Sequence, residues 1–314
     1  MAKKSIRQIA KELKRCPSSI AREINKNRDS LERIRYNPRI AHEKAIINRS
    51  HRGRRLRLKS DLLRQYVKDH LRLGWSPEQI AATAPEKISH EAIYQYIYAQ
   101  VYRNGWGLLR PGCEDLRPYL ARRRKRRLKQ GLRSSYRIDL GILPSIDNRP
   151  RVVDLRERVG HWEDDLIVSK QSRDGLKTIN ERATGLVLIE KVNNKTILES
   201  NRTLIKRLKT IPKRYRQTLT RDRGSENLGY IEIEKVLGTK CYFAHAYHSW
   251  ERGSNENLNG LIHRFLPKKT DFRTISSEQI KQIEYLLNSR PRKKFDWKTP
   301  YEVFYKKTGV ALKV

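Results

Sequence analysis

Cysteine is scarce in this 314-residue sequence, and no two cysteines form a C-x-x-C pair. Cys16, Cys113 and Cys241 are far apart and odd in number, which argues against a disulfide framework and against a cysteine-based zinc site. No apolar run reaches the roughly 18 residues of a membrane helix, and the segment MAKKSIRQIAKELKRC lacks a signal-peptide core. We therefore expect a soluble cytoplasmic protein without a membrane partner.

Acidic residues are also few, because 34 Asp and Glu face 70 Lys and Arg, a formal net charge of +36. Such a charge calls for a polyanionic partner, and nucleic acid is the first candidate. A hydrophobic fraction of 37% with 25 aromatic residues is enough for packed cores. The length favours more than one domain.

A block of basic residues divides the chain. Residues 1–150 carry 36 Lys and Arg against 14 acids, and the segment ARRRKRRLKQGLRSS then precedes the turn-rich GILPSIDNRP. We expect two units at 1–50 and 51–120 whose candidate partner is nucleic acid, a basic linker at 121–150 and a separate domain at 151–314. The block is either a solvated tether or an arm that contacts phosphates. If it is an arm, its DNA-contacting residues are Arg122, Arg123, Arg124, Lys125, Arg126 and Arg127.

The first unit reads as a helix-turn-helix. Ile6, Ile9, Ala10 and Leu13 form one apolar face, and Pro17 with Ser18 ends that helix and starts the next. On the second helix Ile20 and Ile24 point one way, and a polar stripe of Ser19, Arg22, Glu23 and Lys26 points another. A recognition helix needs such a polar front, so Ser19, Arg22 and Lys26 are candidate DNA contacts. An ordinary helical hairpin with a solvated face fits this segment equally well.

The segment WSPEQIAATAPEKISHEAIYQYIYAQ is a second candidate. Ser76, Pro77 and Gln79 predict a capped helix start, and Ser89 can cap the following helix, with Ile93 and Ile97 inward. His90 and Glu91 are then candidate DNA contacts on exposed positions. Tyr94 and Tyr98 share those positions, although tyrosines at this spacing are more often packing residues than base-stacking ones.

The second half alternates strands and helices, which predicts an α/β class. HWEDDLIV, LKTINER and GLVLIEKV read as an antiparallel meander with turns at Asp174-Gly175 and Thr184-Gly185. RQTLTRD and KCYFAHA read as further strands. Helices are expected in ILESNRTLIKRL, from Asn255 to Phe265 and from Ser277 to Leu287.

Three acids in this half stand at the edges of elements. Strand alternation places Glu163, Asp165 and Ile167 on one face and Trp162, Asp164 and Leu166 on the other. Asp222 follows a strand, and Gly224 supplies a turn after it. Glu256 lies in the first turn of a helix that Ser254 can cap, off its apolar stripe of Leu258, Leu261, Ile262 and Phe265.

Three acids without a P-loop, a G-x-S-x-G or an H-E-x-x-H motif favour metal-assisted phosphoryl transfer, in which hard oxygen ligands hold Mg²⁺ or Mn²⁺. Two ions would stabilise the attacking and leaving oxygens. Each acid alone is also compatible with a cap or a surface charge. Arg221, Arg223, Arg252, Lys268 and Lys269 flank the acids and would offset phosphate repulsion, or simply form a solvated face.

These motifs resemble those of the IS-thirty (IS30) family of bacterial insertion-sequence transposases over nearly the whole chain. GHWEDDLI is similar to the family's G-H-W-E-G-D-L-I box, with Asp164 in place of the glycine, and DRGSEN to its D-[RN]-G-x-E box. SWERGSNENLNGLIHRFLPKKTDF is similar to its third box and NSRPRKKFDWKTPYEVF to its closing segment. IAREINKN, GWSPEQIA and ISHEAIYQYIY are similar to its N-terminal boxes.

The resemblance implies an RNase H-like integrase core with catalytic and metal-binding Asp165, Asp222 and Glu256, the last two separated by 33 residues. It implies strand cleavage and transfer on double-stranded DNA, at the element's terminal inverted repeats and at target DNA, by a homo-oligomer. It also implies that the family's leading helix is missing, so that the first unit is truncated. The alternatives are a non-catalytic DNA-binding repressor and a structural nucleoid protein.

Overall fold

The computed structural model describes residues 4–27, 36–50, 58, 60–120, 143–169, 171–245, 248, 251 and 253–312. Contacts divide the chain into two compact units, residues 1–57 and 58–314. The basic residues from Arg122 to Arg127 lie outside the described residues, and the predicted role of this segment stays a prediction. Every described helix is too short or too polar to cross a lipid bilayer.

The first unit contains the helices α1 (Ile6–Glu12), α2 (Pro17–Lys26) and α3 (Pro38–Ser50). Ser5 and Gln8 form a capping box at α1, and Pro17 occupies the first turn of α2, as its fixed φ favours. The predicted apolar face of α1 is only partly correct. Ala10 is buried and Ile9 half-buried, whereas Ile6 and Leu13 are exposed. The described part of this unit therefore has a thin core.

The unit of residues 58–314 begins with the helices α4 (Asp61–Arg72), α5 (Pro77–Thr83), α6 (His90–Ala99) and α7 (Tyr102–Gly105). The capping box of Ser76 and Gln79 and the cap of Ser89 form as predicted. Ile93 and Ile97 are fully buried in a core with Val67, Leu71 and Ile80. Tyr94 and Tyr98 are half-buried against this core rather than exposed, and their rings stack at 6.4 Å.

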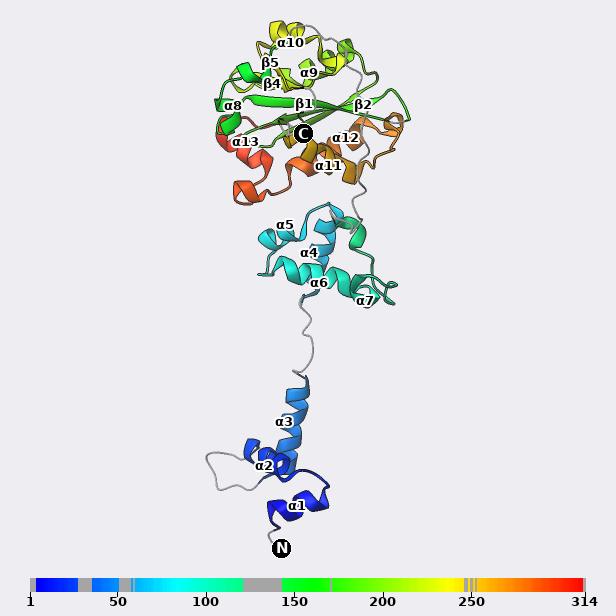
Figure 1. Ribbon diagram of the computed structural model, residues 1–314, viewed down its shortest axis with the longest axis vertical. Coiled ribbons are helices and arrows are strands. Elements are labelled where there is room, and N and C mark those ends of the chain that lie inside the picture. The colour runs from blue at the N-terminus through cyan, green and yellow to red at the C-terminus, as the bar shows by residue number, and fades with distance from the viewer. Residues whose placement is uncertain are drawn as a thin grey trace. The chain divides into compact units, whose positions relative to one another are not determined.

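A five-stranded mixed sheet organises the rest of the chain (Figure 1). Its strands stand in the order β3-β2-β1-β4-β5, antiparallel between β1, β2 and β3 and parallel between β1, β4 and β5. The strands are β1 (His161–Val168), β2 (Gly175–Glu181), β3 (Val187–Val192), β4 (Thr218–Arg221) and β5 (Lys240–Phe243). The predicted meander and the α/β class are confirmed.

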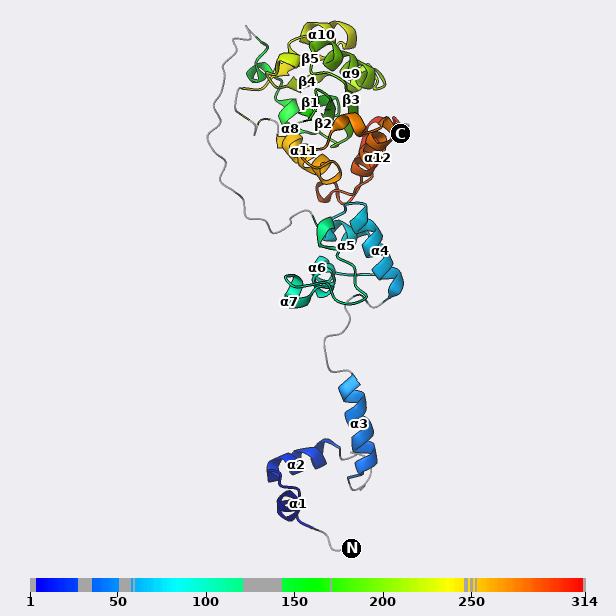
Figure 2. The ribbon, with the colours of Figure 1, turned by 90° about the vertical axis from the view of Figure 1, so that its right-hand side faces the viewer.

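Helices cover both faces of this sheet, with α9 and α10 on one side and α11 and α12 on the other (Figures 1 and 2). The helices are α8 (Val152–Leu155), α9 (Ile197–Lys209), α10 (Tyr230–Leu237), α11 (Gly253–Phe265), α12 (Ser277–Asn288) and α13 (Pro300–Thr308). Trp162, Ile179 and Leu219 pack on the α9 side, with Phe304 of α13. Ile167 and Leu176 pack on the α11 and α12 side. Successive residues of one strand thus enter different cores, as the alternation predicts.

Candidate active site

Asp165 and Asp222 lie on the same face of the sheet. The parallel register pairs Glu163 of β1 with Thr220 of β4. Continuing this register by two residues along each segment matches Asp165 with Asp222, which directly follows the end of β4. The side chain of Asp165 faces α11, because Asn259 Nδ2 of that helix donates to Asp165 Oδ2 at 2.8 Å. Both carboxylates are half-buried. The pairing of β1 with β4 therefore brings together two acids that are 57 positions apart.

Asp164 faces the opposite side and is fully buried there. Its carboxylate pairs with Lys177 Nζ at 2.5 Å and with Arg221 Nη2 at 3.1 Å, and all three side chains are inaccessible to solvent. Burial alone would raise the pKa of Asp164, but the charges of Arg221 and Lys177 outweigh it and hold this pKa below its ordinary value. Asp164 is a structural anion between two strands and points away from the face of Asp165.

Asn227 connects this buried group to Asp222. Its Oδ1 accepts from Arg221 Nη2 at 2.7 Å, and its Nδ2 donates to Asp222 Oδ1. The backbone N–H of Gly224 donates to the same Asp222 oxygen at 3.2 Å. The expectation that Arg221 offsets phosphate repulsion is wrong, because its guanidinium is buried and already bound by Asp164 and Asn227. Arg221 instead positions the loop that carries Asp222.

The helix α11 supplies the third acid. Asn255 Nδ2 donates to the Asp164 carbonyl at 3.3 Å, which fixes the first turns of α11 against β1. Glu256 follows in the first turn with an exposed side chain. The sequence suggested that Ser254 caps this helix. The helix begins at Gly253, so Ser254 lies inside it and is not its cap. Leu258 and Ile262 are buried, which confirms the centre of the predicted apolar stripe.

The three acids fit a hard divalent cation by donor chemistry, since carboxylate oxygens are the ligands that Mg²⁺ and Mn²⁺ prefer. Their oxygens are not all within 4.8 Å of one another. The Glu256 side chain is exposed, whereas Asp165 and Asp222 are each held by an amide, that of Asn259 or Asn227. The arrangement is thus two oriented carboxylates and one exposed carboxylate.

A histidine cluster that the sequence reasoning did not single out lies next to α11. Among the described residues, His245, His248 and Glu251 have side-chain ligand atoms close enough together to hold one metal ion. His245 Nδ1 lies 2.8 Å from Glu251 Oε1, and its Nε2 lies 2.9 Å from Asp147 Oδ2. The bond to Glu251 and the charge of Asp147 raise the pKa of His245. The spacing H-x-x-H-x-x-E in the sequence was the signal that could have found this cluster.

The flanking cations divide into different groups. Arg223 is exposed and its Nε donates to the Ala244 carbonyl at 3.2 Å, and Lys268 and Lys269 are exposed after α11. Arg252 lies outside the described residues. Arg223, Lys268 and Lys269 remain available to a phosphate, whereas Arg221 does not.

The predicted DNA contacts of the helical units are accessible wherever the structure describes them. Ser19, Arg22 and Lys26 are exposed on α2, while Ile20 and Ile24 are half-buried. His90 and Glu91 are exposed in the first turn of α6. Their contact with DNA stays a prediction.

Comparison with solved structures returns retroviral integrase cores. The catalytic core of BIV integrase matches with a TM-score of 0.39 and 16% identity, over 48% of this chain and 97% of that core. A magnesium complex of the HTLV-2 integrase core matches with a TM-score of 0.37 and 18% identity, over 46% of this chain and 95% of that core.

A family model described as a helix-turn-helix domain matches residues 1–27. The transposase of IS4351 from Bacteroides fragilis is 36% identical over 91% of this chain and 86% of its own length. Transposase InsI of IS30A from Escherichia coli K12 is 34% identical over 99% of this chain and 81% of its own. The transposase of IS1086 from Cupriavidus metallidurans is 33% identical over 95% of this chain and 88% of its own length. Together with the three acidic boxes of the sequence, this similarity shows that the chain belongs to the IS30 family of transposases.

Proposed function

We propose that this protein is a DNA transposase that binds the terminal inverted repeats of an insertion sequence and cleaves and joins DNA strands at Asp165, Asp222 and Glu256. The observation that carries the proposal is the placement of the acids. Sheet register aligns Asp165 with Asp222, and Asn259 on α11, one turn after Glu256, contacts Asp165. Membership in a transposase family and a charge of +36 support the same reaction and the same polyanionic substrate.

Asp165, Asp222 and Glu256 would hold Mg²⁺ or Mn²⁺, most simply as a pair of ions. A bound ion would polarise the scissile phosphate and lower the pKa of an attacking water or 3′-hydroxyl. The amides of Asn259 and Asn227 orient the two aspartates before substrate binds, so little reorganisation remains for the reaction. Arg223, Lys268 and Lys269 are placed to reduce the repulsion between the acids and the phosphates.

Substrate recognition falls to the helical units in this proposal. Ser19, Arg22 and Lys26 on α2 and His90 and Glu91 on α6 would contact the terminal repeats, and the basic block around Arg122 to Arg127 would contact phosphates. Cleavage and joining of two element ends calls for more than one active site, so we propose that the protein works as a homo-oligomer. A bacterial cytoplasm, where the DNA is, is the corresponding location.

A nicking assay tests the proposal. The purified protein is incubated with a labelled duplex carrying the element's end, with Mg²⁺ and in parallel with Ca²⁺ or EDTA. We expect a 3′ end to be released only with Mg²⁺ or Mn²⁺, and we expect Asp222→Asn and Glu256→Gln to abolish release while retaining DNA binding. Glu278→Gln is the matched control, because Glu278 is likewise an exposed acid in the first turn of a helix, α12.

The outcomes separate the candidate functions. Nicking by the wild type that both acid variants lose supports the transposase. A mobility shift without nicking by the wild type would instead indicate the repressor. Nicking that Glu256→Gln retains would remove Glu256 from the site.

A further inference from the structure

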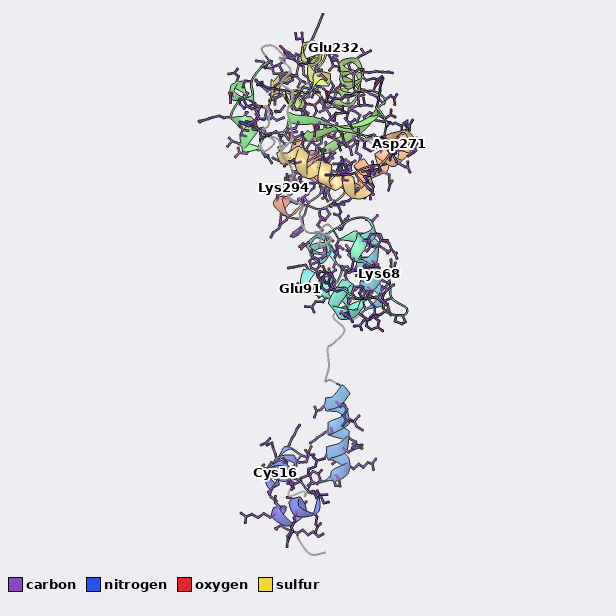
Figure 3. The ribbon with its side chains drawn as sticks, turned by 45° about the vertical axis from the view of Figure 1, so that its right-hand side comes forward. Cys16, Lys68, Glu91, Glu232, Asp271 and Lys294 are labelled. Carbon is purple, nitrogen blue, oxygen red and sulfur yellow. The ribbon has the colours of Figure 1, made fainter. Side chains whose placement is uncertain are left out.

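A pocket of about 550 Å³ lies beside α11, on the side of the sheet that α11 and α12 cover. Ser254, Asn257, Leu258 and Leu261 of α11 line it, together with Ser76 and Gln79 at the start of α5. Its cationic lining residues are Arg156, Arg182, Arg264, Arg290, Arg292, Lys293 and Lys294, and Glu78 is the single carboxylate among the described lining residues. We call this cavity the basic pocket. Figure 3 shows Lys294 on this side of the sheet.

Most of these cations have no anionic partner among the residues that the structure describes. Arg182 is neutralised by Glu163 and Asp154. Within the described part of the chain, the other six cations of the pocket form no salt bridge. Arg264 Nη2 donates to the Tyr119 carbonyl at 2.8 Å, which satisfies a hydrogen bond but not the charge. The pocket therefore concentrates positive charge that the protein itself does not compensate.

Arg290 is the extreme case. Its side chain is only 3% exposed, and its Nε and Nη2 atoms have no hydrogen-bond partner in the described structure. A Cβ added at Gly74 would lie 2.8 Å from Arg290 Nη2, so the turn before α5 closes over this guanidinium. Burial, with Arg264 and Arg292 nearby, lowers the pKa of Arg290 to about 9. A buried cation with unpaired donors is costly, and the described part of the chain provides no partner for these donors.

The position of the pocket relative to the candidate active site follows from helix geometry. Ser254, Asn257, Leu258 and Leu261 have the i, i+3, i+4, i+7 spacing of one helix face. Glu256 is off that face and Asn259 contacts Asp165 on another. The two sites therefore share α11 and open on different sides of it.

We propose that the basic pocket binds a backbone phosphate of the DNA that occupies the active site, through the Arg264 guanidinium and the Lys294 ammonium, and that the buried Arg290 strengthens this binding by its positive charge. Guanidinium groups match the geometry of two phosphate oxygens, and Ser254 and Asn257 add neutral donors. The inference rests on the proposed function, because it takes that DNA as the ligand.

A salt titration tests the inference with a fluorescent 30-base-pair duplex of mixed sequence. All proteins carry Asp165→Asn so that the duplex is not cleaved. The pocket variant is Arg264→Gln with Lys294→Gln, and the control is Lys281→Gln with Lys306→Gln, which removes two exposed charges outside the pocket. We expect the slope of log K against log [NaCl] to flatten by about 0.9 for each lost phosphate contact in the pocket variant. Equal slopes for the two variants would overturn the proposal.

A second measurement avoids replacing the buried Arg290, whose loss could unfold the domain. The Nε–Hε NMR signals of Arg290 and Arg264 are followed in the full chain as duplex, or inorganic phosphate alone, is added. Both ligands should shift these two signals, and the duplex should do so at lower concentration. Signals that stay in place at saturating duplex reject the pocket.

The two proposals can fail independently. Shifted arginine signals without nicking by the wild type would retain the pocket and reject the chemistry. Nicking with unshifted signals would retain the transposase and reject the pocket.

Discussion

Two adjacent aspartates show that a residue's position along a strand determines which side of the sheet its side chain faces. Asp164 and Asp165 are neighbours in β1, yet Asp164 lies between Lys177 and Arg221 and Asp165 faces Asn259 of α11. Strand alternation sends the first into a buried ion cluster and the second to the candidate active site. Their replacement should therefore have different consequences.

We expect Asp164→Asn to destabilise the fold by about 3–5 kcal/mol, because it leaves two buried cations without their anion. Asp165→Asn should change the free energy of unfolding little and abolish nicking. Urea denaturation and the nicking assay measure the two effects. An Asp164→Asn variant as stable as the wild type would show that the buried cluster is not required.

The pKa of His245 predicts a pH dependence. Because it is raised in the folded protein, this histidine contributes stability that is fully present below its unfolded pKa of about 6.5 and is lost as pH rises through the folded pKa. We expect the difference in Tm between wild type and His245→Asn to be largest near pH 6 and to shrink toward pH 8.5. His42→Asn, at an exposed position, is the control. A Tm difference that grows with pH would contradict a raised pKa of His245 in the folded protein.

At the scale of elements, α12 protects an open edge of the sheet. β3 is an edge strand, and its outward backbone groups would otherwise be free to pair with another chain. Asn288 Oδ1 accepts from the Val187 N–H at 2.9 Å, and its Nδ2 donates to the Val187 carbonyl at 2.7 Å. Glu284 Oε2 accepts from the Ile189 N–H at 2.6 Å. Side chains of a helix thus take the place of a sixth strand.

Asn288→Ala should therefore lower the free energy of unfolding by about 1–3 kcal/mol, since it leaves the buried N–H and carbonyl of Val187 unpaired. Gln282→Ala, an exposed residue of the same helix, should have little effect. Chemical denaturation measures both variants, and light scattering reports edge-to-edge association. Equal stability of the two variants would mean that water replaces Asn288 at no cost.

The helix α2 gives the second prediction at this scale. A side chain that reads bases contributes to discrimination, whereas one that contacts phosphates strengthens binding to every sequence. Arg22→Ala should therefore cost about 1–3 kcal/mol of binding free energy on the terminal repeats and much less on scrambled duplex. Competition binding, with Glu91→Ala of α6 in parallel, measures this. Equal loss on both duplexes, or none, would reject base reading by α2.

At the scale of the whole molecule, charge is the dominant property, and the block from Arg122 to Arg127 holds the densest part of it. Replacing these six residues by alanine should flatten the salt dependence of DNA binding, because each neutralised phosphate releases counterions. The slope of log K against log [salt] on random duplex measures the change. An unchanged slope would make the block a tether.

Local pattern was sufficient for much of this protein. The strands β1 to β5, the helices α9, α11 and α12 and the caps of α5 and α6 follow from periodicity and capping residues, which act within a few positions. Alternation along β1 also separated Asp164 from Asp165 correctly, and the acidic boxes indicated the family. The helices α10 and α13 were not predicted, although both pack on the α9 side of the sheet.

Only the tertiary structure decided which groups meet. The register of β1 with β4 matches Asp165 with Asp222. Packing of α9 against the sheet encloses Arg221, for which the sequence had suggested either a phosphate contact or a solvated position. The basic pocket draws on α5, α11 and the segment after α12, which are far apart in the chain. Burial and pairing depend on residues brought together from distant positions, so local sequence does not contain them.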